Sequence, residues 1–453
     1  MISDTIAAIA TGAMASSGAI AIIRVSGDEA INIVNKIFKG KNLNTQESHT
    51  IHYGRIICPE TCVIIDEVLV MLMRSPRSFT TEDVVEINCH GGAFVTKRIL
   101  ELILTSGARH AQAGEFSKRA FLNGRIDLSE AEAIMDIIEA KSNHALELAM
   151  GSLDGKVTKL INELREDILD IIAHIEVNID YPEYDEVEEM TNDILLPKSI
   201  AVREKMEQLL QTAKTGQLLK NGIKTAIIGR PNVGKSSLLN QLVREEKAIV
   251  TNIAGTTRDT VEGFVNIGGI TLNLIDTAGI RKTNDTVELI GVEKSKQLIK
   301  EAELVLLVLN SGEALTSEDI EILWLTEHKN RIILLNKSDL NQKIATDNLP
   351  NYIPTSMTEE LGITQLENEI KSLFEINEIK SSETFISNTR HIAKLNQSLA
   401  AVENAIDQMH IGMPIDMIEI DVKNSWDFLG EIIGEGSTDE LISELFTKFC
   451  LGK

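Results

Sequence analysis

Cysteine is scarce in this chain, with only four among 453 residues, at Cys58, Cys62, Cys89 and Cys450. So low a number excludes a disulfide framework as the main source of stability. Cys58 and Cys62 stand at nearly the spacing of a metal-binding pair, but no second Cys/His pair lies nearby in the sequence. We therefore expect no structural metal at this pair.

Basic residues are also fewer than acidic ones. The chain has 44 Lys and Arg and 68 Asp and Glu, which gives a net charge of −24. A strongly acidic protein is a poor non-specific nucleic-acid binder. Any RNA contact must therefore use a local basic patch.

Long apolar runs are lacking as well. Residues 6–23 carry no charge, but the small loop-forming residues of 11–18 interrupt them, and Asp4 stands where a signal peptide is basic. We expect a strand, a loop and a strand here, in a cytoplasmic protein without membrane insertion. With 43% hydrophobic residues, the composition is that of a globular chain of two to four domains.

The periodicity of the sequence changes three times. Residues 1–118 alternate β-rich runs with helical segments, which predicts an α+β domain. Residues 119–219 have helical periodicity, 220–376 alternate strands and helices, and 377–453 are helical again. The predicted architecture is multidomain α+β, with a helical domain interrupted by an inserted, doubly wound α/β domain.

The most informative motif is the phosphate-binding loop G-x-x-x-x-G-K-S at 229–236, which follows an apolar run and opens a helical stretch. Glycines let the backbone N–H groups and the helix N-terminus face a phosphate. Lys235 is expected to reach the β- and γ-phosphates in a catalytic role, and the Ser236 hydroxyl to ligate Mg²⁺. The candidate nucleotide contacts of this loop are Asn232, Val233, Gly234, Lys235, Ser236 and Ser237.

A second motif, D-x-x-G, ends the apolar strand at Asp276–Gly279. Asp276 can hold the metal through water, and the Gly279 N–H can meet the γ-phosphate, with Thr277 and Ala278 between them.

A third motif, N-K-x-D, follows another apolar strand and comprises Asn336, Lys337 and Asp339. A buried Asp339 can accept two hydrogen bonds, from N1–H and from the exocyclic amine of guanine. Adenine offers neither donor in that place, so ATP would leave the carboxylate unpaired. The sequence therefore predicts GTP, with Ser356 in a loop that backs the base.

Hydrolysis poses a problem for this sequence, because Ile280 stands where small regulatory GTPases place a water-orienting Gln. Two residues can compensate. The Asn232 side-chain oxygen can hold a monovalent cation beside the phosphates, and Glu288 can polarise water. The alternatives are a loop hydrogen-bonder at Asn232 and a solvent-facing helix residue at Glu288. Residues 251–257 form a first switch in which Thr257 is a second Mg²⁺ ligand and Thr256 closes a cation site.

The flanking blocks are more specific than the nucleotide motifs. With them the chain resembles the tRNA modification GTPases of the MnmE (TrmE) family from its N-terminus to its last four residues. The matching blocks are Asp4–Ala10, Ile23–Gly27, Ser78–Ile87, Cys89–Gly92, Gly114–Leu128 and Cys450–Lys453.

The resemblance implies a homodimer built through the N-terminal domain, and GTPase domains that dimerise when K⁺ is bound. In this family K⁺ replaces an arginine finger. Carried over by position, Asn232, Thr251, the Ile253 backbone and Thr256 hold K⁺; Ser236 and Thr257 hold Mg²⁺; and Glu288 orients water.

The resemblance also implies a reduced folate, methylene- or formyl-tetrahydrofolate, in the N-terminal domain. The matching positions are Arg24, Glu82, Arg125 and Lys453. Cations suit the glutamate tail of the folate, and a carboxylate suits its amino-pyrimidine edge. For Cys450 two readings stay open, a buried apolar residue and a catalytic one.

The family acts with a flavoprotein partner, MnmG (also called GidA), in a hetero-oligomer. The partner supplies FAD and uses NADH. Together they add a carboxymethylaminomethyl or aminomethyl group at C5 of the wobble uridine in certain tRNAs. The alternative is a ribosome-assembly or signalling GTPase that acts as an RNA-binding switch. That function needs a basic RNA-binding appendage, which this acidic chain does not show.

Overall fold

The chain is described here from a computed structural model, which divides into two compact units. Unit 1 combines Met1–Met135 with Leu429–Lys453, and unit 2 is Asp136–Phe428. The structure describes residues 4–11, 18–180, 191–245, 263–275, 291–345, 349–359, 361–374, 385–449 and 452.

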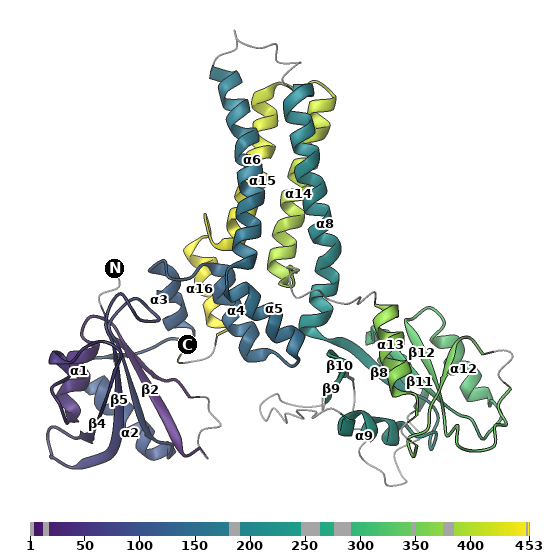
Figure 1. Cartoon of the computed structure of the whole chain (residues 1–453), viewed down its shortest axis with the longest axis horizontal. Coiled ribbons are helices and arrows are strands. Elements are labelled where there is room, and N and C mark those ends of the chain that lie inside the picture. The colour runs from purple at the N-terminus through teal and green to yellow at the C-terminus, as the bar shows by residue number, and fades with distance from the viewer. Residues whose placement is uncertain are drawn as a thin grey trace. The chain divides into compact units, whose positions relative to one another are not determined.

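Unit 1 is built on a seven-stranded sheet in the order β3-β4-β5-β6-β2-β1-β7 (Figure 1). Neighbouring strands are antiparallel except for β1 and β7, which are parallel. The two strands expected within residues 6–23 are confirmed as β1 and the start of β2, and residues 12–17 of the expected loop lie outside the described residues. The strands are β1 (Ile6–Ile9), β2 (Ile20–Ser26), β3 (Phe38–Lys39), β4 (Thr50–Ile57), β5 (Ile64–Met73), β6 (Val84–His90) and β7 (Arg109–His110).

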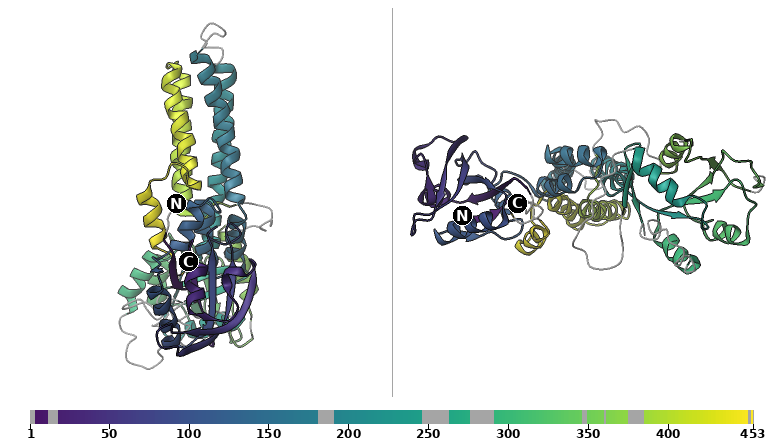
Figure 2. Two further views of the ribbon diagram at one scale, coloured as in Figure 1. Left: turned by 90° about the vertical axis from the view of Figure 1, so that its left-hand side faces the viewer. Right: turned by 90° about the horizontal axis from the view of Figure 1, so that it is seen from below.

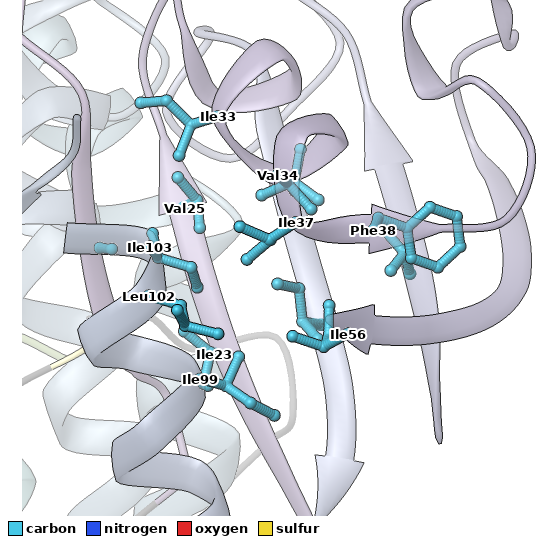
Figure 3. Packing of buried hydrophobic residues seen from close by; sticks show 14 of the residues in the cluster. Ile23, Val25, Ile33, Val34, Ile37, Phe38, Ile56, Ile99, Leu102 and Ile103 are labelled. Carbon is cyan, nitrogen blue, oxygen red and sulfur yellow. The ribbon is translucent and has the colours of Figure 1, made fainter. Parts of the chain in front are cut away.

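The core of unit 1 lies between this sheet and two helices, α1 (Ala30–Ile37) and α2 (Ala93–Thr105). Figure 3 shows Ile23 of β2 lying toward Ile99 of α2. Because side chains alternate across a strand, Arg24 points to the opposite face of the sheet. On that face Arg24 lies opposite Ala8 of β1, which belongs to a small apolar cluster with Ile6, Ala111 and Phe116.

Two carboxylates near β1 and β7 are paired with arginines. Asp4 accepts from Arg109 Nε at 2.7 Å, and this bond is the main reason that its pKa lies below the ordinary value. Burial by itself would raise the pKa of Glu115, but hydrogen bonds from Arg109, the Gln112 N–H and Arg119 outweigh it and lower the pKa. Both groups are therefore more acidic in the folded chain than in the unfolded chain.

This difference predicts that unit 1 loses stability in acid. A carboxyl with a lowered folded pKa stabilises the fold above its unfolded pKa, and that contribution disappears as the pH falls through the folded pKa. The loss should begin as the pH falls below the ordinary Glu value of 4.5. Thermal unfolding of the wild type and of Glu115→Gln across this range checks it. The variant should show a shallower acid loss, while Glu101→Gln, on the exposed side of α2, should match the wild type. Equal acid losses in all three chains would contradict the pairing.

Three further helices belong wholly or largely to unit 1: α3 (Glu115–Leu122), α4 (Leu128–Glu139) and α16 (Asp439–Thr447). Residues 377–453 were predicted to be helical, and within the described residues 389–447 the helices are interrupted at 411–414 and again at 434–438. Gly434 has φ +98°, and a Cβ there would lie 2.8 Å from the Phe121 ring. Only glycine allows the chain to turn so close to α3, and α15 ends there.

The helical part of unit 2 is a bundle in which α6, α8, α14 and α15 run side by side (Figures 1 and 2). Residues at three- and four-residue spacing on α6, such as Ile161, Leu164 and Ile168, are buried, as their periodicity predicted. The helices are α5 (Asn143–Leu153), α6 (Lys156–Asp180), η3 (Thr191–Leu195), α8 (Leu196–Asn221), α14 (Thr389–His410) and α15 (Ile415–Ile433).

The α/β part of unit 2 is a six-stranded sheet in the order β13-β12-β11-β8-β10-β9. All neighbours are parallel except β9, which pairs antiparallel with β10 at the edge. The elements are β8 (Ile223–Ile228), α9 (Lys235–Glu245), β9 (Gly263–Ile267), β10 (Ile270–Leu274), α11 (Gly291–Glu301), β11 (Leu304–Asn310), α12 (Ser317–Leu325), β12 (Arg331–Asn336), β13 (Tyr352–Pro354) and α13 (Ile363–Leu373).

Strand β11 is buried along its whole length. Leu306 and Val308 join the apolar cluster on one face of the sheet, and Leu307 and Leu309 join the cluster on the other. A parallel strand covered by helices on both faces reads as a continuous apolar run, as it does here. The predicted fold class is confirmed: an N-terminal α+β domain and a helical domain interrupted by an α/β domain. Among the helices described, none is long and apolar enough to cross a membrane.

Candidate functional site

The phosphate-binding loop connects β8 to α9 at the carboxyl edge of the parallel strands. A Cβ at Gly229 would lie 2.3 Å from the Val308 carbonyl oxygen, so the loop passes β11 at a distance that only glycine permits. Asn232 and Gly234 both have positive φ, at +64° and +105°. The chain then enters α9 at Lys235, which places a helix N-terminus at the loop, as an anion site requires.

Lys235 spans this loop. Its Nζ donates to the carbonyl oxygens of Gly229 and Arg230, at 2.7 Å each. The ammonium group is therefore held at the loop itself, where the sequence predicted a phosphate contact.

Arg230 holds the first half of the loop from outside, and sequence reasoning had missed it. Its Nε donates to Asp319 at 2.8 Å and its Nη2 donates to Glu313 at 3.1 Å. Burial lowers the pKa of Arg230, but these two acceptors more than offset that effect and raise it. Asp319 is buried and also caps α12 with Thr316. The one available signal was the capping-box sequence from Thr316 to Asp319.

The N-K-x-D motif is tied to the phosphate loop. Asn336 Nδ2 donates to the Val233 carbonyl at 2.8 Å, and Lys337 Nζ donates to the Asn232 carbonyl at 3.0 Å. A Cβ at Gly234 would lie 2.1 Å from Asn336 Nδ2. The structure therefore brings these two predicted nucleotide residues against the phosphate loop and fixes the spacing between the two loops.

The hydrogen bond from Asn336 to the Val233 carbonyl should contribute to nucleotide binding. Asn336→Ala should weaken GTP binding about tenfold, because it leaves the buried Val233 carbonyl unpaired at about 1–3 kcal/mol. Titration with a fluorescent GTP analogue measures the loss. Asn330→Ala, at an exposed position before β12, is the matched control and should bind as the wild type does. Unchanged affinity of Asn336→Ala would show that the tie does not hold the site.

Asp339 lies beside the loop that was expected to back the base. Ser356 is fully buried, and its Oγ donates to Asp339 Oδ1 at 2.7 Å. Ser338 donates to the Thr355 carbonyl through both its N–H and its hydroxyl, at 3.1 and 2.9 Å. These bonds join the two base loops.

One expectation about Asp339 was wrong. Asp339 was expected to be buried, but it is exposed, because β12 ends at Asn336 and Asp339 lies in the turn that follows. Its Oδ1 is oriented by Ser356, so the carboxylate is held at the surface of the sheet edge, where a base can cover it.

The cation role of Asn232 stays a prediction, and its side chain is exposed at the phosphate loop. Its carbonyl is engaged by Lys337, while its exposed side-chain amide has no hydrogen-bond partner within the residues that the structure describes. An amide oxygen in this position suits a monovalent cation. Ser236, the predicted Mg²⁺ ligand, lies half-buried in the first turn of α9, and Ser237 beside it is exposed.

Several predicted site residues lie outside the described residues, and their assignments stay predictions. These are Thr251, Ile253, Thr256, Thr257, Asp276, Thr277, Ala278, Gly279, Glu288, Cys450 and Lys453, together with Ile280.

In unit 1, two of the predicted folate residues flank one aromatic ring. The guanidinium carbons of Arg24 and Arg125 lie 5.9 and 5.7 Å from the centre of the Phe79 ring. Arg24 also donates to Glu86 at 2.7 Å and to the Gly452 carbonyl at 3.3 Å. Gly452 thus lies at the same place. Phe79 was missed because nothing in its local sequence distinguishes it from a core residue.

The third predicted residue, Glu82, is held at both oxygens. Arg119 donates to its Oε1 at 2.9 Å, and Ser26 donates to its Oε2 at 2.6 Å. Ser26 and Arg24 are two residues apart on β2 and therefore share a face of the sheet. The structure thus gathers Arg24, Glu82 and Arg125 around the loop that follows β5.

The phosphate loop and the N-K-x-D loop meet at the carboxyl edge of one mixed sheet, and this geometry defines the α/β domain as a P-loop GTPase. Comparison with known proteins narrows the class. Residues 5–125 match the family model for the GTP-binding protein TrmE N-terminus, and residues 128–450 match the one for the MnmE helical domain.

Curated relatives match along the whole chain. The tRNA modification GTPase MnmE of Bacillus thuringiensis (strain Al Hakam) is 54% identical over 457 residues, which cover 99% of each chain. The protein of that name from Streptococcus pyogenes serotype M3 is 54% identical over 453 residues, covering 99% of this chain and 98% of its own. The chain belongs to the MnmE family of tRNA modification GTPases, as its flanking blocks predicted. It is a GTP hydrolase that serves tRNA modification.

Proposed function

We propose that the chain is a K⁺-activated, Mg²⁺-dependent GTPase. The observation that carries the K⁺ proposal is Asn232, whose side-chain amide is exposed in the phosphate loop while its backbone is held by Lys337. Thr251, the Ile253 backbone and Thr256 complete the proposed K⁺ site. A cation there supplies positive charge where negative charge develops in the transition state.

The remaining parts of the catalytic proposal follow from the same motifs. Ser236 and Thr257 hold Mg²⁺, Asp276 holds it through water, and Lys235 binds the phosphates. Glu288 orients the attacking water, in place of the Gln that is absent at Ile280. Thr277, Ala278 and Gly279 contact the nucleotide near its γ-phosphate.

Hydrolysis measured in KCl and in NaCl at equal ionic strength tests this proposal. We expect a rate higher in KCl by on the order of 10², and Asn232→Ala should reduce the ratio toward one. Asn240→Ala, on an exposed position of α9, should keep the full ratio. Equal wild-type rates in the two salts would remove K⁺ from the mechanism.

We also propose that unit 1 binds a reduced folate, methylene- or formyl-tetrahydrofolate. Arg24, Arg125 and Lys453 would hold its glutamate carboxylates, and Glu82 would accept from its amino-pyrimidine edge. Support comes from the two guanidiniums that flank Phe79 and from the fixed carboxylate of Glu82. Bound folate would supply the one-carbon unit, and Cys450 is a candidate for a chemical role beside it.

Calorimetric titration with 5-formyl-tetrahydrofolate tests the folate proposal. Glu82→Ala should weaken binding at least about tenfold, as the loss of a charged hydrogen bond predicts. Glu101→Ala, on the exposed side of α2, should bind normally. No measurable binding by the wild-type chain would exclude a folate in unit 1.

In the complete reaction, we propose, the chain acts in the cytoplasm as a homodimer with the flavoprotein MnmG, which carries FAD and uses NADH. The pair would add the carboxymethylaminomethyl or aminomethyl group at C5 of the wobble uridine in certain tRNAs. Co-purification tests the partnership: one of the two proteins carries a tag, and recovery of the other protein with it is measured. A chain that elutes alone in the presence of excess flavoprotein would contradict it.

A further inference from the structure

The loop between β5 and β6 carries two residues of the proposed folate site, Phe79 and Glu82. Its backbone is strained, because Thr81 has φ +61°, a left-handed conformation that β-branched residues rarely adopt. Such a conformation persists only where the surrounding structure holds it. The contacts that hold this loop therefore bear on the site.

Three contacts come from α3 and from the residues just after it. Arg119 donates to the Glu82 carboxylate at 2.9 Å, Asn123 Nδ2 donates to the Thr80 carbonyl at 2.7 Å, and Arg125 donates to the Ser78 carbonyl. These residues belong to the sequence block 114–128, which the resemblance had singled out. The block thus holds the loop at three successive points.

Arg119 is the most strongly fixed of the three. Its side chain is 1% exposed, and its terminal nitrogens also donate to the Asp4 carbonyl at 2.9 Å, to the Asp4 carboxylate at 2.8 Å and to Glu115 at 3.1 Å. A guanidinium stays charged in proteins, so a buried one needs carboxylate partners. The Asp4 and Glu115 carboxylates supply that charge at Nη2, while Nη1 donates to Glu82 and to the Asp4 carbonyl.

Ser26 fixes the second oxygen of Glu82. Its Oγ donates to Glu82 Oε2 at 2.6 Å and lies 2.6 Å from Thr80 Oγ1. Ser26 and Thr80 are both fully buried, so the contact between their hydroxyls is shielded from water. With one donor at each oxygen, the Glu82 carboxylate has a single orientation, and each oxygen keeps a further lone pair for a ligand.

We propose that Arg119 and Ser26 are positioning residues for Glu82. They orient its carboxylate toward the paired N–H donors of a 2-amino-4-oxo-pyrimidine edge, and neither touches the ligand. This inference rests on the proposed folate function and adds the two groups that set its geometry. Residues that orient metal ligands through a hydrogen bond typically change metal affinity or activity 10–100-fold when they are replaced. The same range is expected here.

Calorimetric titration of the full-length chain with 5-formyl-tetrahydrofolate tests the proposal. Ser26→Ala should weaken binding about tenfold, and Arg119→Lys should weaken it because lysine lacks the planar fork that reaches three carboxylates. Ser117→Ala is the matched control: Ser117 is a fully buried serine on α3 whose hydroxyl has no partner among the described residues. It should bind as the wild type does. Thermal unfolding of every variant reports whether it is folded.

A double-mutant cycle separates positioning from general support of the fold. If Ser26 acts through Glu82, Ser26→Ala should cause no further loss of affinity in a Glu82→Gln background. Losses that add in the double variant, or wild-type affinity of Ser26→Ala, would overturn the positioning role while leaving the folate proposal standing. A wild-type chain that binds no folate would overturn both. Because Ser26→Ala removes only one hydroxyl, the cycle decides the positioning role of Ser26 even if Arg119→Lys fails to fold.

Discussion

Lys235→Ala is expected to lower kcat/KM for GTP hydrolysis by about 10²–10³ or more. The ammonium group is held at the phosphate loop by the carbonyls of Gly229 and Arg230, within reach of the β- and γ-phosphates that the loop is built to bind. In the transition state, negative charge spreads over the phosphoryl oxygens. Alanine cannot neutralise that charge, and Arg230, the other cation of the loop, is paired with Asp319 and Glu313.

Phosphate release under single-turnover conditions measures this effect. Lys224→Ala provides the matched control, because Lys224 is an exposed lysine on β8 in the same domain. It should hydrolyse GTP at the wild-type rate. A Lys235→Ala chain that retains more than about a tenth of the wild-type kcat/KM would contradict the assignment of this loop as the catalytic phosphate site.

Asp339→Asn is expected to change the nucleotide preference from GTP to xanthosine triphosphate. Ser356 orients the carboxylate, which the sequence predicts to accept from N1–H and from the exocyclic amine of guanine. An asparagine presents an N–H₂ group to that amine, so donor meets donor and GTP affinity should fall by on the order of 10⁴. Xanthine has a carbonyl oxygen in place of the amine. The same N–H₂ group can donate to it, and xanthosine triphosphate should become the preferred nucleotide.

Competitive displacement of a fluorescent guanine nucleotide by GTP and by xanthosine triphosphate measures the exchange. Glu327→Gln, which removes one exposed carboxylate elsewhere in the domain, should retain the wild-type order. Loss of GTP binding without gain of xanthosine triphosphate binding would indicate that Asp339 supports the loop and does not read the base. Unchanged GTP affinity would exclude any role for it.

Much of the fold could be predicted from local patterns. The apolar run of β11 and the three- and four-residue spacing on α6 each report a single element and its burial. The end of α15 at Gly434 was not predicted, because its cause is the close approach of Phe121, which is distant in the sequence. Periodicity describes which face of an element is apolar, and it does not reveal which element will pack there.

In the sites too, local motifs could be predicted from the sequence, whereas contacts between distant residues could not. The phosphate loop is one continuous motif, so its place between β8 and α9 followed from the sequence. The tie from Asn336 to Val233 spans 103 residues, and the bond from Arg119 to Glu82 spans 37. Such contacts depend on strand order and on the path of α3, and no single motif encodes them. The exposure of Asp339 was missed for a related reason, since it depends on where β12 ends.

The central claim is that GTP hydrolysis at the loop of Lys235 drives modification of tRNA. The most direct test is mass spectrometry of the wobble uridine in tRNA from cells whose only copy of this gene carries Lys235→Ala. Loss of the C5 group, with the group retained in cells that carry Lys224→Ala, is the predicted result. Wobble uridine that is fully modified in the Lys235→Ala cells would contradict the claim.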